Sequence, residues 1–318
     1  MRSQDGRPPL KIAHFSDIHI TAPSSEIALR NLLSKRVLGW INLTLLRRGH
    51  HFADGERILG AFIEDIDQVR PDHVVSTGDL TALSLPGEFE TARRLLAPLL
   101  DRPQVTGIPG NHDVYVRSAA RLKLYEKAFG SWTRTDLGPE DFPPEFRHLH
   151  PYPLVRFFGE DVVLLALRDA RPNLFHDSTG RVGAPQRRLL EHILRDPRLS
   201  RRVKVLAAHC GYWRAGGRPD RIYHRLRDGR ALLEIAREGG VSLVIHGHTH
   251  QRFVMPRGKE SPVHLANPGS LTASCQDRSY HLYTISDGGI EVSVRRFDSQ
   301  AGRFVPWPDA PGAQVLEL

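Results

Sequence analysis

The chain has 318 residues, of which 40% are hydrophobic, and this suffices to bury a sizeable core without disulfide bonds. Its two cysteines, Cys210 and Cys275, exclude a disulfide-rich module and a zinc cluster built of cysteines alone. Lysine and arginine total 44 against 36 aspartates and glutamates; this net charge of +8 suits an anionic partner, although solubility alone also accounts for it.

Short apolar runs rich in β-branched residues predict buried strands that alternate with helices. The expected strands are 11–16, 73–77, 104–108, 162–167, 203–208 and 241–245. The expected helices are 57–69, 88–100, 117–129, 186–195 and 229–238. This alternation predicts an α/β fold with a largely parallel sheet. Four further runs, 253–255, 263–266, 281–285 and 290–296, predict a second, more antiparallel sheet packed beside the first.

Two segments interrupt this alternation. Segment 131–153 is rich in proline and aromatic residues and predicts a loop. Ile27–Ala53 combines basic residues with apolar ones such as Trp40 and contains no acidic residue. This composition predicts either an amphipathic helix on an acidic membrane face or a cap helix packed on the domain. We therefore expect one domain over 1–318, with a cap-like insertion at 24–54 and an extended tail over 298–318.

The chain contains no run of about 18 uncharged apolar residues, which predicts that no segment spans a bilayer. The polar stretch before Pro9 lacks the apolar core of a signal peptide. We therefore expect a cytoplasmic protein.

Polar motifs follow five of the predicted strands directly. They are Asp17-Ile18-His19, Gly78-Asp79, Gly110-Asn111-His112-Asp113, His209 and Gly247-His248-Thr249-His250. Because the carboxyl ends of strands in an open α/β sheet face one crevice, we expect these side chains to converge. Carboxylate oxygens and imidazole nitrogens suit Mn, Fe, Zn, Co or Ni. One ion does not need this many ligands, so the set predicts two ions about 3.5–4 Å apart and bridged by a carboxylate.

In this order, the motifs resemble the pattern of the calcineurin-like metallophosphoesterase superfamily. The resemblance implies a fold of two packed mixed β-sheets flanked by helices. It also implies metal ligands: Asp17, His19 and His250 for the first ion, Asn111, His209 and His248 for the second, and Asp79 as the bridge. In the family, the residue matching His112 is not a ligand but faces the substrate, as a general acid for the leaving oxygen or as a stabiliser of transition-state charge.

Other residues near the motifs have less specific patterns. Asp113 is expected either to orient His112 or to cap the helix 117–129. Arg117 and Arg214 are candidate phosphate contacts, although surface solubility is the better explanation for each taken singly. Cys210 is expected to be a small buried hydrophobic residue.

The resemblance implies a dinuclear-metal hydrolase that cuts phosphodiester or pyrophosphate bonds through a metal-activated hydroxide, with Mn as the first choice of metal. Bacterial relatives include phosphodiesterases, nucleases and pyrophosphatases that cut UDP-2,3-diacylglucosamine. Because the basic, apolar segment Ile27–Ala53 follows the first motif, we expect a nucleotide-linked lipid as substrate and contact of this segment with the acidic inner membrane face. We expect no obligate protein partner. The alternatives are a cyclic-nucleotide or nucleic-acid phosphodiesterase, and a non-catalytic metal-binding scaffold, which the complete ligand set disfavours.

Overall fold

The computed structural model describes residues 8–21, 36, 54–174, 176–274, 277–310 and 313–318. The predicted insertion 24–54 therefore lies outside the described residues, except for Arg36 and Asp54. None of the described helices combines the length and the apolar character that crossing a membrane requires.

Two mixed β-sheets form the centre of the molecule. The first sheet has the order β14-β13-β12-β1-β2-β3, with β15 also paired to β13, and the second has the order β10-β11-β9-β6-β5-β4. The strands of the first sheet are β1 (Leu10–Phe15), β2 (His73–Ser76), β3 (Val105–Gly107), β12 (Ser279–Ser286), β13 (Gly289–Asp298), β14 (Arg303–Pro306) and β15 (Gln314–Leu316). Those of the second are β4 (Leu154–Phe158), β5 (Val162–Ala166), β6 (Val203–Ala207), β9 (Val241–Ile245), β10 (Phe253–Met255) and β11 (His264–Asn267). A small hairpin pairs β7 (Trp213–Arg214) with β8 (Arg218–Pro219).

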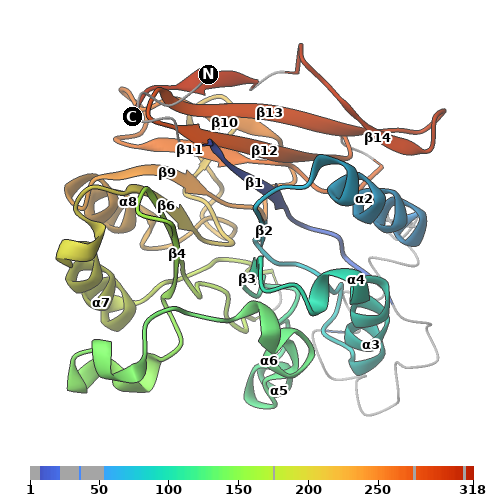
Figure 1. The fold of residues 1–318 in the computed structure, drawn as a ribbon. Helices are drawn as coiled ribbons and strands as arrows, with labels where there is room; N and C mark the ends of the chain where they lie inside the picture. Colours follow the sequence, from blue (N-terminus) through green and yellow to red (C-terminus); the bar gives the residue numbers. More distant parts are fainter. Residues whose placement is uncertain (1–7, 22–35, 37–53, 175, 275–276, 311–312) are drawn as a thin grey trace.

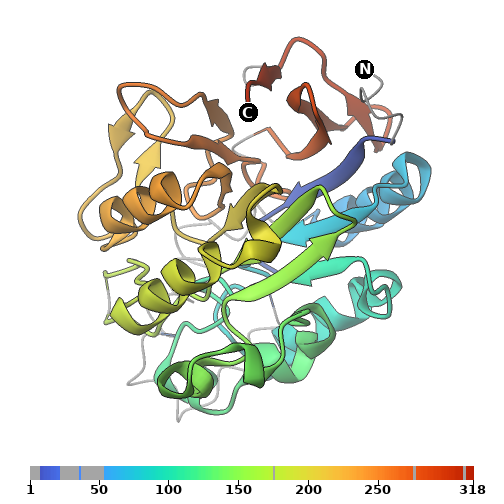
Figure 2. The ribbon, with the colours of Figure 1, turned by 60° about the vertical axis from the view of Figure 1, so that its left-hand side comes forward.

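Helices cover the outer face of each sheet. The first sheet carries α2 (Gly55–Val69), α3 (Pro86–Leu95), α4 (Ala97–Leu100), α5 (Arg117–Arg121) and α6 (Leu124–Phe129). The second carries α7 (Ala184–Leu194) and α8 (Gly229–Glu238). Short 3-10 helices lie at Gly130–Trp132, Pro139–Asp141, Pro144–Leu149 and Pro197–Leu199. The two groups of helices lie on different sides of the molecule (Figures 1 and 2).

The buried apolar residues form three main clusters that correspond to these layers. One cluster joins α2 and α3 to the first sheet, for example through Phe62 and Phe15. A second joins α7 and α8 to the second sheet. The third lies between the sheets and includes Ile12 from β1 and Ile245 from β9. This layered α/β/β/α arrangement confirms the fold class that the family resemblance implied.

The predicted division of strands between the sheets is wrong. Strands β1, β2 and β3 do not share a parallel sheet with β5, β6 and β9. Instead, β1 pairs in antiparallel register with β12 from the C-terminal part of the chain, with Ile12 opposite Tyr283 (Figure 1). Strand β9 pairs with β11. Each sheet is thus assembled from distant parts of the chain, which local apolar patterns do not encode.

Several predicted boundaries also differ from the structure. The helix expected over 88–100 divides at Leu96 into α3 and α4, because Pro98 has no amide hydrogen to continue the helical ladder. The helix expected over 117–129 divides at Lys123, whose backbone is left-handed with φ 52°. The expected loop 131–153 contains three short 3-10 helices and leads into β4, which the prediction missed. The segment 298–318 is not a tail: it contributes β14 and β15 to the first sheet.

Candidate metal centre

The five motifs meet at the carboxyl ends of β1, β2, β3, β6 and β9, where the two sheets adjoin. Backbone hydrogen bonds tie the motifs together in pairs, with Asp17 N donating to Gly78 O over 3.0 Å and Gly247 N donating to His209 O over 3.0 Å. The amide of His248 also donates to Asp17 Oδ2 at 2.9 Å, which connects the second sheet to the first. The structure therefore brings together side chains that are up to 233 positions apart in the sequence.

Four groups of potential ligands result from this convergence, and within each the ligand atoms lie within 4.8 Å of one another. The groups are Asp17 with His19 and His250, His19 with Asp79 and His112, Asp17 with Asp79 and His209, and His209 with Cys210 and His248. Asn111 adjoins them, since its Oδ1 lies 3.0 Å from His209 Nε2.

Asp79 lies between the groups. Its Oδ1 accepts a hydrogen bond of 2.7 Å from the His112 amide. Its Oδ2 lies 3.7 Å from His19 Nε2 on one side and 3.4 Å from His209 Nε2 on the other. One carboxylate oxygen thus faces imidazoles from both groups, as a bridging ligand would.

The side chains around Asp17 fit a cation. Asp17 Oδ1 is buried and accepts no hydrogen bond from the described residues. It lies 3.3 Å from His250 Nε2, and His250 Nε2 lies only 2.9 Å from His19 Nε2. Two ring nitrogens and a carboxylate oxygen therefore point at one small volume, which is the donor set that a divalent transition metal prefers.

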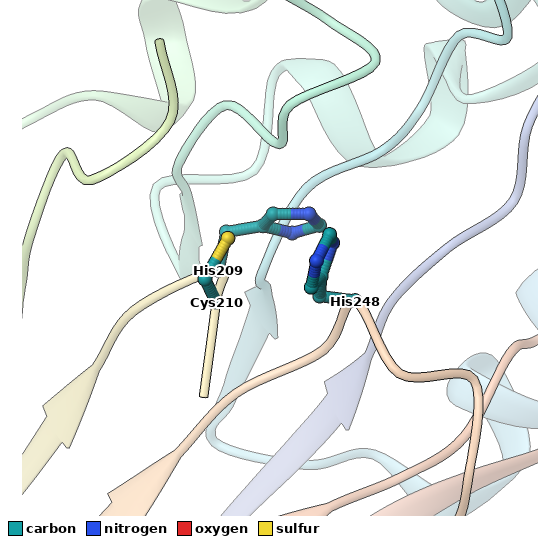
Figure 3. Close-up of side chains that lie close together, drawn as sticks. All are labelled: His209, Cys210 and His248. Atoms are coloured by element: carbon teal, nitrogen blue, oxygen red, sulfur yellow. The ribbon is translucent and has the colours of Figure 1, made fainter. Parts of the chain in front are cut away.

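On the other side of Asp79, backbone carbonyls orient two imidazoles. His209 Nδ1 lies 2.7 Å from Thr77 O, and His248 Nε2 lies 2.8 Å from His224 O. Because a carbonyl only accepts, these nitrogens donate the hydrogen bonds, and the other nitrogen of each ring has a lone pair for a cation whenever the ring is neutral. Figure 3 shows the two rings close together, with centroids 5.0 Å apart.

Cys210 stands beside these rings in Figure 3. It is buried among apolar side chains from α8 and β9. Burial, reinforced by the nearby Asp169 carboxylate, raises the pKa of the thiol well above its ordinary value. This apolar burial agrees with the small buried hydrophobic residue that we expected.

Left-handed backbone conformations are concentrated at the centre. Asp17, His19, Asp79, His248 and His250 have φ values of 58°, 48°, 56°, 69° and 55°. Each such conformation costs a non-glycine residue about 1 kcal/mol or more and persists only where its surroundings enforce it. The end of β11 and the residues after it do so here: Asn267 Nδ2 donates to Gly247 O at 2.6 Å, and Ser270 Oγ donates to Asp17 O at 2.6 Å.

Two motif positions require glycine because side-chain atoms of a neighbouring motif lie close to their Cα atoms. A Cβ on Gly247 would lie 1.9 Å from Ser16 Oγ, and a Cβ on Gly110 would lie 2.1 Å from Asp79 Oδ1. Any side chain at either position would therefore push the motifs apart.

The charges of the central groups depend on one another. Burial acts to raise the pKa of Asp79, but the imidazoles of His209 and His112 outweigh it and hold that pKa well below its usual value. Burial conversely acts to lower the pKa of His209, and the Asp79 carboxylate raises it to about 10. The ionised carboxylates thus require positive charge next to them, which either imidazolium groups or cations supply.

His112 lies at the partly exposed edge of the centre. Its Nδ1 lies 2.6 Å from Ala82 O, and its ring meets the His19 ring edge-on and stacks on Tyr115. Burial lowers the pKa of His112 to about 4, although the Asp79 carboxylate opposes this shift. The contact with Ala82 leaves Nε2 as the nitrogen available to a substrate.

The remaining predicted residues are placed as follows. Asp113 does not cap a helix, because α5 begins after Val116 without a side-chain cap. Its carboxylate instead accepts hydrogen bonds from Gly110 N and Thr81 N, both at 2.9 Å, and so joins two motif loops. Burial, followed by the charge of Asp79, raises the pKa of Asp113 to about 7. Arg117 is exposed at the start of α5, and Arg214 is half-buried on β7.

Sequence reasoning missed two residues that support the centre. The buried Asp169 accepts hydrogen bonds of 2.8 Å from the amides of His209 and Cys210. It follows β5 almost directly, so the rule that found the other motifs also points to it. His224 stacks on His248 with ring centroids 3.9 Å apart, and no local pattern marks it.

The sequence profile of the family described as calcineurin-like phosphoesterase matches residues 10–252. The chain belongs to this family. No curated protein sequence matches it significantly. Family membership and the four ligand groups together indicate a metal-dependent phosphoesterase, a hydrolase with a dinuclear divalent-metal site.

Solved structures share the fold of this phosphoesterase. A dimetal phosphatase from Danio rerio is similar with a TM-score of 0.62 at 13% identity, over 91% of this chain and 96% of that one. The sulfate thiohydrolase SoxB from Thermus thermophilus is similar with a TM-score of 0.53 at 16% identity, over 94% of this chain and 58% of that one. At such low identity these similarities concern the fold alone.

Proposed function

We propose that this phosphoesterase hydrolyses phosphodiester or pyrophosphate bonds at the centre around Asp79. Asp17, His19 and His250 hold one cation, and Asn111, His209 and His248 hold the other. The observation that carries this proposal is the position of Asp79 Oδ2, 3.7 Å from His19 Nε2 and 3.4 Å from His209 Nε2. When bound, two such cations lower the pKa of a shared water and neutralise charge on the phosphoryl oxygens.

His112 serves as the general acid in this proposal. Because Nδ1 donates to Ala82 O, the ring carries a second proton on Nε2 only as an imidazolium. In this proposal the imidazolium, which the Asp79 carboxylate favours, delivers that Nε2 proton to the leaving oxygen. Its partly exposed position at the edge of the ligand groups supports this role. Arg117 and Arg214 remain proposed contacts for phosphate oxygens.

We propose a nucleotide-linked lipid such as UDP-2,3-diacylglucosamine as the substrate, and Mn as the metal. The support is the basic, apolar composition of Ile27–Ala53, together with the one described side chain of that segment. Arg36 donates to Leu83 O and Ser84 O, in the loop that contacts His112. The basic and apolar composition of Ile27–Ala53 suits an amphiphilic substrate at the cytoplasmic face of the inner membrane.

Metal content tests the dinuclear assignment. We expect the parent protein to bind two Mn ions per chain after dialysis, measured by elemental analysis. Asp79→Ala should lose at least one of them, because it removes the oxygen that faces both groups. Asp287→Ala, which removes an exposed carboxylate, is the matched control and should retain both. At most one ion in the parent at saturating Mn would refute the assignment.

Removal of the general acid tests the role of His112. We expect His112→Ala to lower turnover of a diester with an alkoxide leaving group by about 10²–10⁴-fold, while bound metal is unchanged. The exposed His148 provides the control, since His148→Ala should leave turnover unaltered. An unchanged rate in His112→Ala would remove this residue from the mechanism.

A substrate panel with Mn tests the proposed substrate class. We expect the highest kcat/KM for a UDP-linked diacyl lipid in detergent, with lower values for a chromogenic diester, cyclic AMP and single-stranded DNA. A preference for DNA that falls steeply with added salt would instead identify a nuclease, because such binding releases counterions.

A further inference from the structure

Three large apolar side chains are exposed on two loops, one of which leads into His224 at the metal centre. Leu174, Ile222 and Tyr223 expose 72%, 67% and 68% of their surface, and we call them the apolar rim. They belong to two loops, which Ser178 joins by hydrogen bonds from its amide and its hydroxyl to Tyr223 O, at 2.9 and 3.2 Å. The apolar rim is thus one local feature of the fold and not a set of scattered residues.

The apolar rim is rigidly connected to the centre. His224 follows Tyr223, and its ring stacks on the His248 ring with centroids 3.9 Å apart. The backbone carbonyl of His224 also accepts a hydrogen bond from His248 Nε2. Backbone hydrogen bonds to Arg221 O from the amides of His224 and Arg225 close the turn that presents Ile222 and Tyr223. The turn therefore holds these side chains in place at one edge of the site.

The surroundings of the apolar rim are basic. Segment 213–228 contains five arginines and two aspartates, and Arg218 and Arg221 are exposed. Both aspartates have partners inside the protein: Asp220 contacts His224 Nδ1 at 2.5 Å, and Asp228 accepts from the amides of Val182 and Gly183. Arg227 pairs with Asp177 of the Leu174 loop at 2.6 Å, so the exposed Arg218 and Arg221 provide the positive charge that this surface presents outward.

We propose that the apolar rim and its arginines dock the enzyme on an anionic lipid bilayer, with the metal centre facing the headgroups. Apolar side chains enter the interface while guanidinium groups remain among the anionic headgroups, and these two contributions add. The inference deepens the proposed function, on which it rests for a lipid-linked substrate. Docking itself requires no turnover, so the two can fail separately.

Vesicle sedimentation without substrate tests the docking. We expect binding to phosphatidylcholine vesicles that contain phosphatidylglycerol, weakened by added salt, and little binding to phosphatidylcholine alone. Ile222→Ser with Tyr223→Ser should reduce binding about tenfold or more, because apolar surface is no longer buried. Val315→Ser removes a side chain that is 56% exposed on β15 and should not change binding.

Equal binding by the double variant and the parent, or no preference for anionic vesicles, would overturn the proposal. Binding to polyglutamate but not to vesicles would also overturn it, and would indicate an acidic protein partner. Hydrolysis of a water-soluble chromogenic diester, measured on the same preparations, reports on the proposed function independently of docking.

A different set of contacts concerns Arg36. Its buried guanidinium donates from Nε to Leu83 O at 3.0 Å and from Nη2 to Ser84 O at 2.5 Å. Glu88 accepts from the amides of Leu83 and Leu85 in the same loop, at 2.8 and 3.0 Å. The backbone of this loop is therefore held from two sides, through its carbonyls by Arg36 and through its amides by Glu88.

The same loop positions His112. Ala82 O lies 2.6 Å from His112 Nδ1, and Ser84 Oγ donates to His112 O at 2.6 Å. From these contacts we infer that Arg36 is a positioning residue for His112. This second inference rests on the general-acid role of His112.

Two leaving groups separate positioning from general structural support. Nitrophenolate departs without protonation, whereas an alkoxide needs the acid. We expect Arg36→Ala to lower kcat about tenfold or more for an alkyl diester but by less than about threefold for a nitrophenyl diester. Arg36→Lys should recover part of the loss. Arg93→Ala, on the surface of α3, is the control.

A double-mutant cycle completes this test. In a His112→Ala background, Arg36→Ala should have no further effect on the alkyl diester, because the group that it positions is gone. If Arg36→Ala or Arg36→Lys lowers kcat equally for the alkyl and the nitrophenyl diester, the inference is overturned. It is also overturned if Arg36→Ala lowers kcat for the alkyl diester in the His112→Ala background as much as in the parent. If His112→Ala itself shows no leaving-group dependence, the proposed general acid fails first.

Discussion

The buried carboxylate of Asp79 is the group on which the rest of the centre depends. One of its oxygens accepts a hydrogen bond from the His112 amide, and the other faces the imidazoles of His19 and His209. A buried charge raises the free energy of the folded state unless hydrogen-bond donors or positive charges compensate it, and no single element of the fold provides enough such groups. Loops from both sheets must therefore converge, and the packing of one sheet on the other is what holds them at the required distances.

Much of the surrounding structure stabilises loops and does not contact the centre directly. Asp113 and Asp169 both bind backbone amides of the motifs, and Asn267 and Ser270 bind motif backbone in the same way. These hydrogen bonds offset the cost of the left-handed residues. They also explain why polar side chains are abundant in a buried region: each satisfies a backbone group that a sharp turn leaves unpaired.

Two parts of the chain adjoin the centre at different residues and are suited to different tasks. Arg36 contacts the loop that holds His112, and the turn carrying the apolar rim contacts His248 through His224. The first contact affects His112, the proposed general acid. The second places exposed apolar and basic side chains beside the ligands. The proposed acid catalysis and the proposed membrane docking therefore depend on separate residues of one framework, which can be altered independently.

The sequence by itself determined which residues meet. Each motif directly follows an apolar run, and in parallel strands the carboxyl ends face one edge, so Asp17, Asp79, Asn111, His209 and His248 were predictable as neighbours. Glycines at 110 and 247 marked the tight turns. Only the tertiary structure decided which strands share a sheet, since pairing β1 with β12 depends on contacts between residues some 270 positions apart. The tertiary structure also decided the break at Lys123, the strands β14 and β15, and the placement of His224 against His248. Local sequence patterns do not encode these features, because they depend on packing between distant segments.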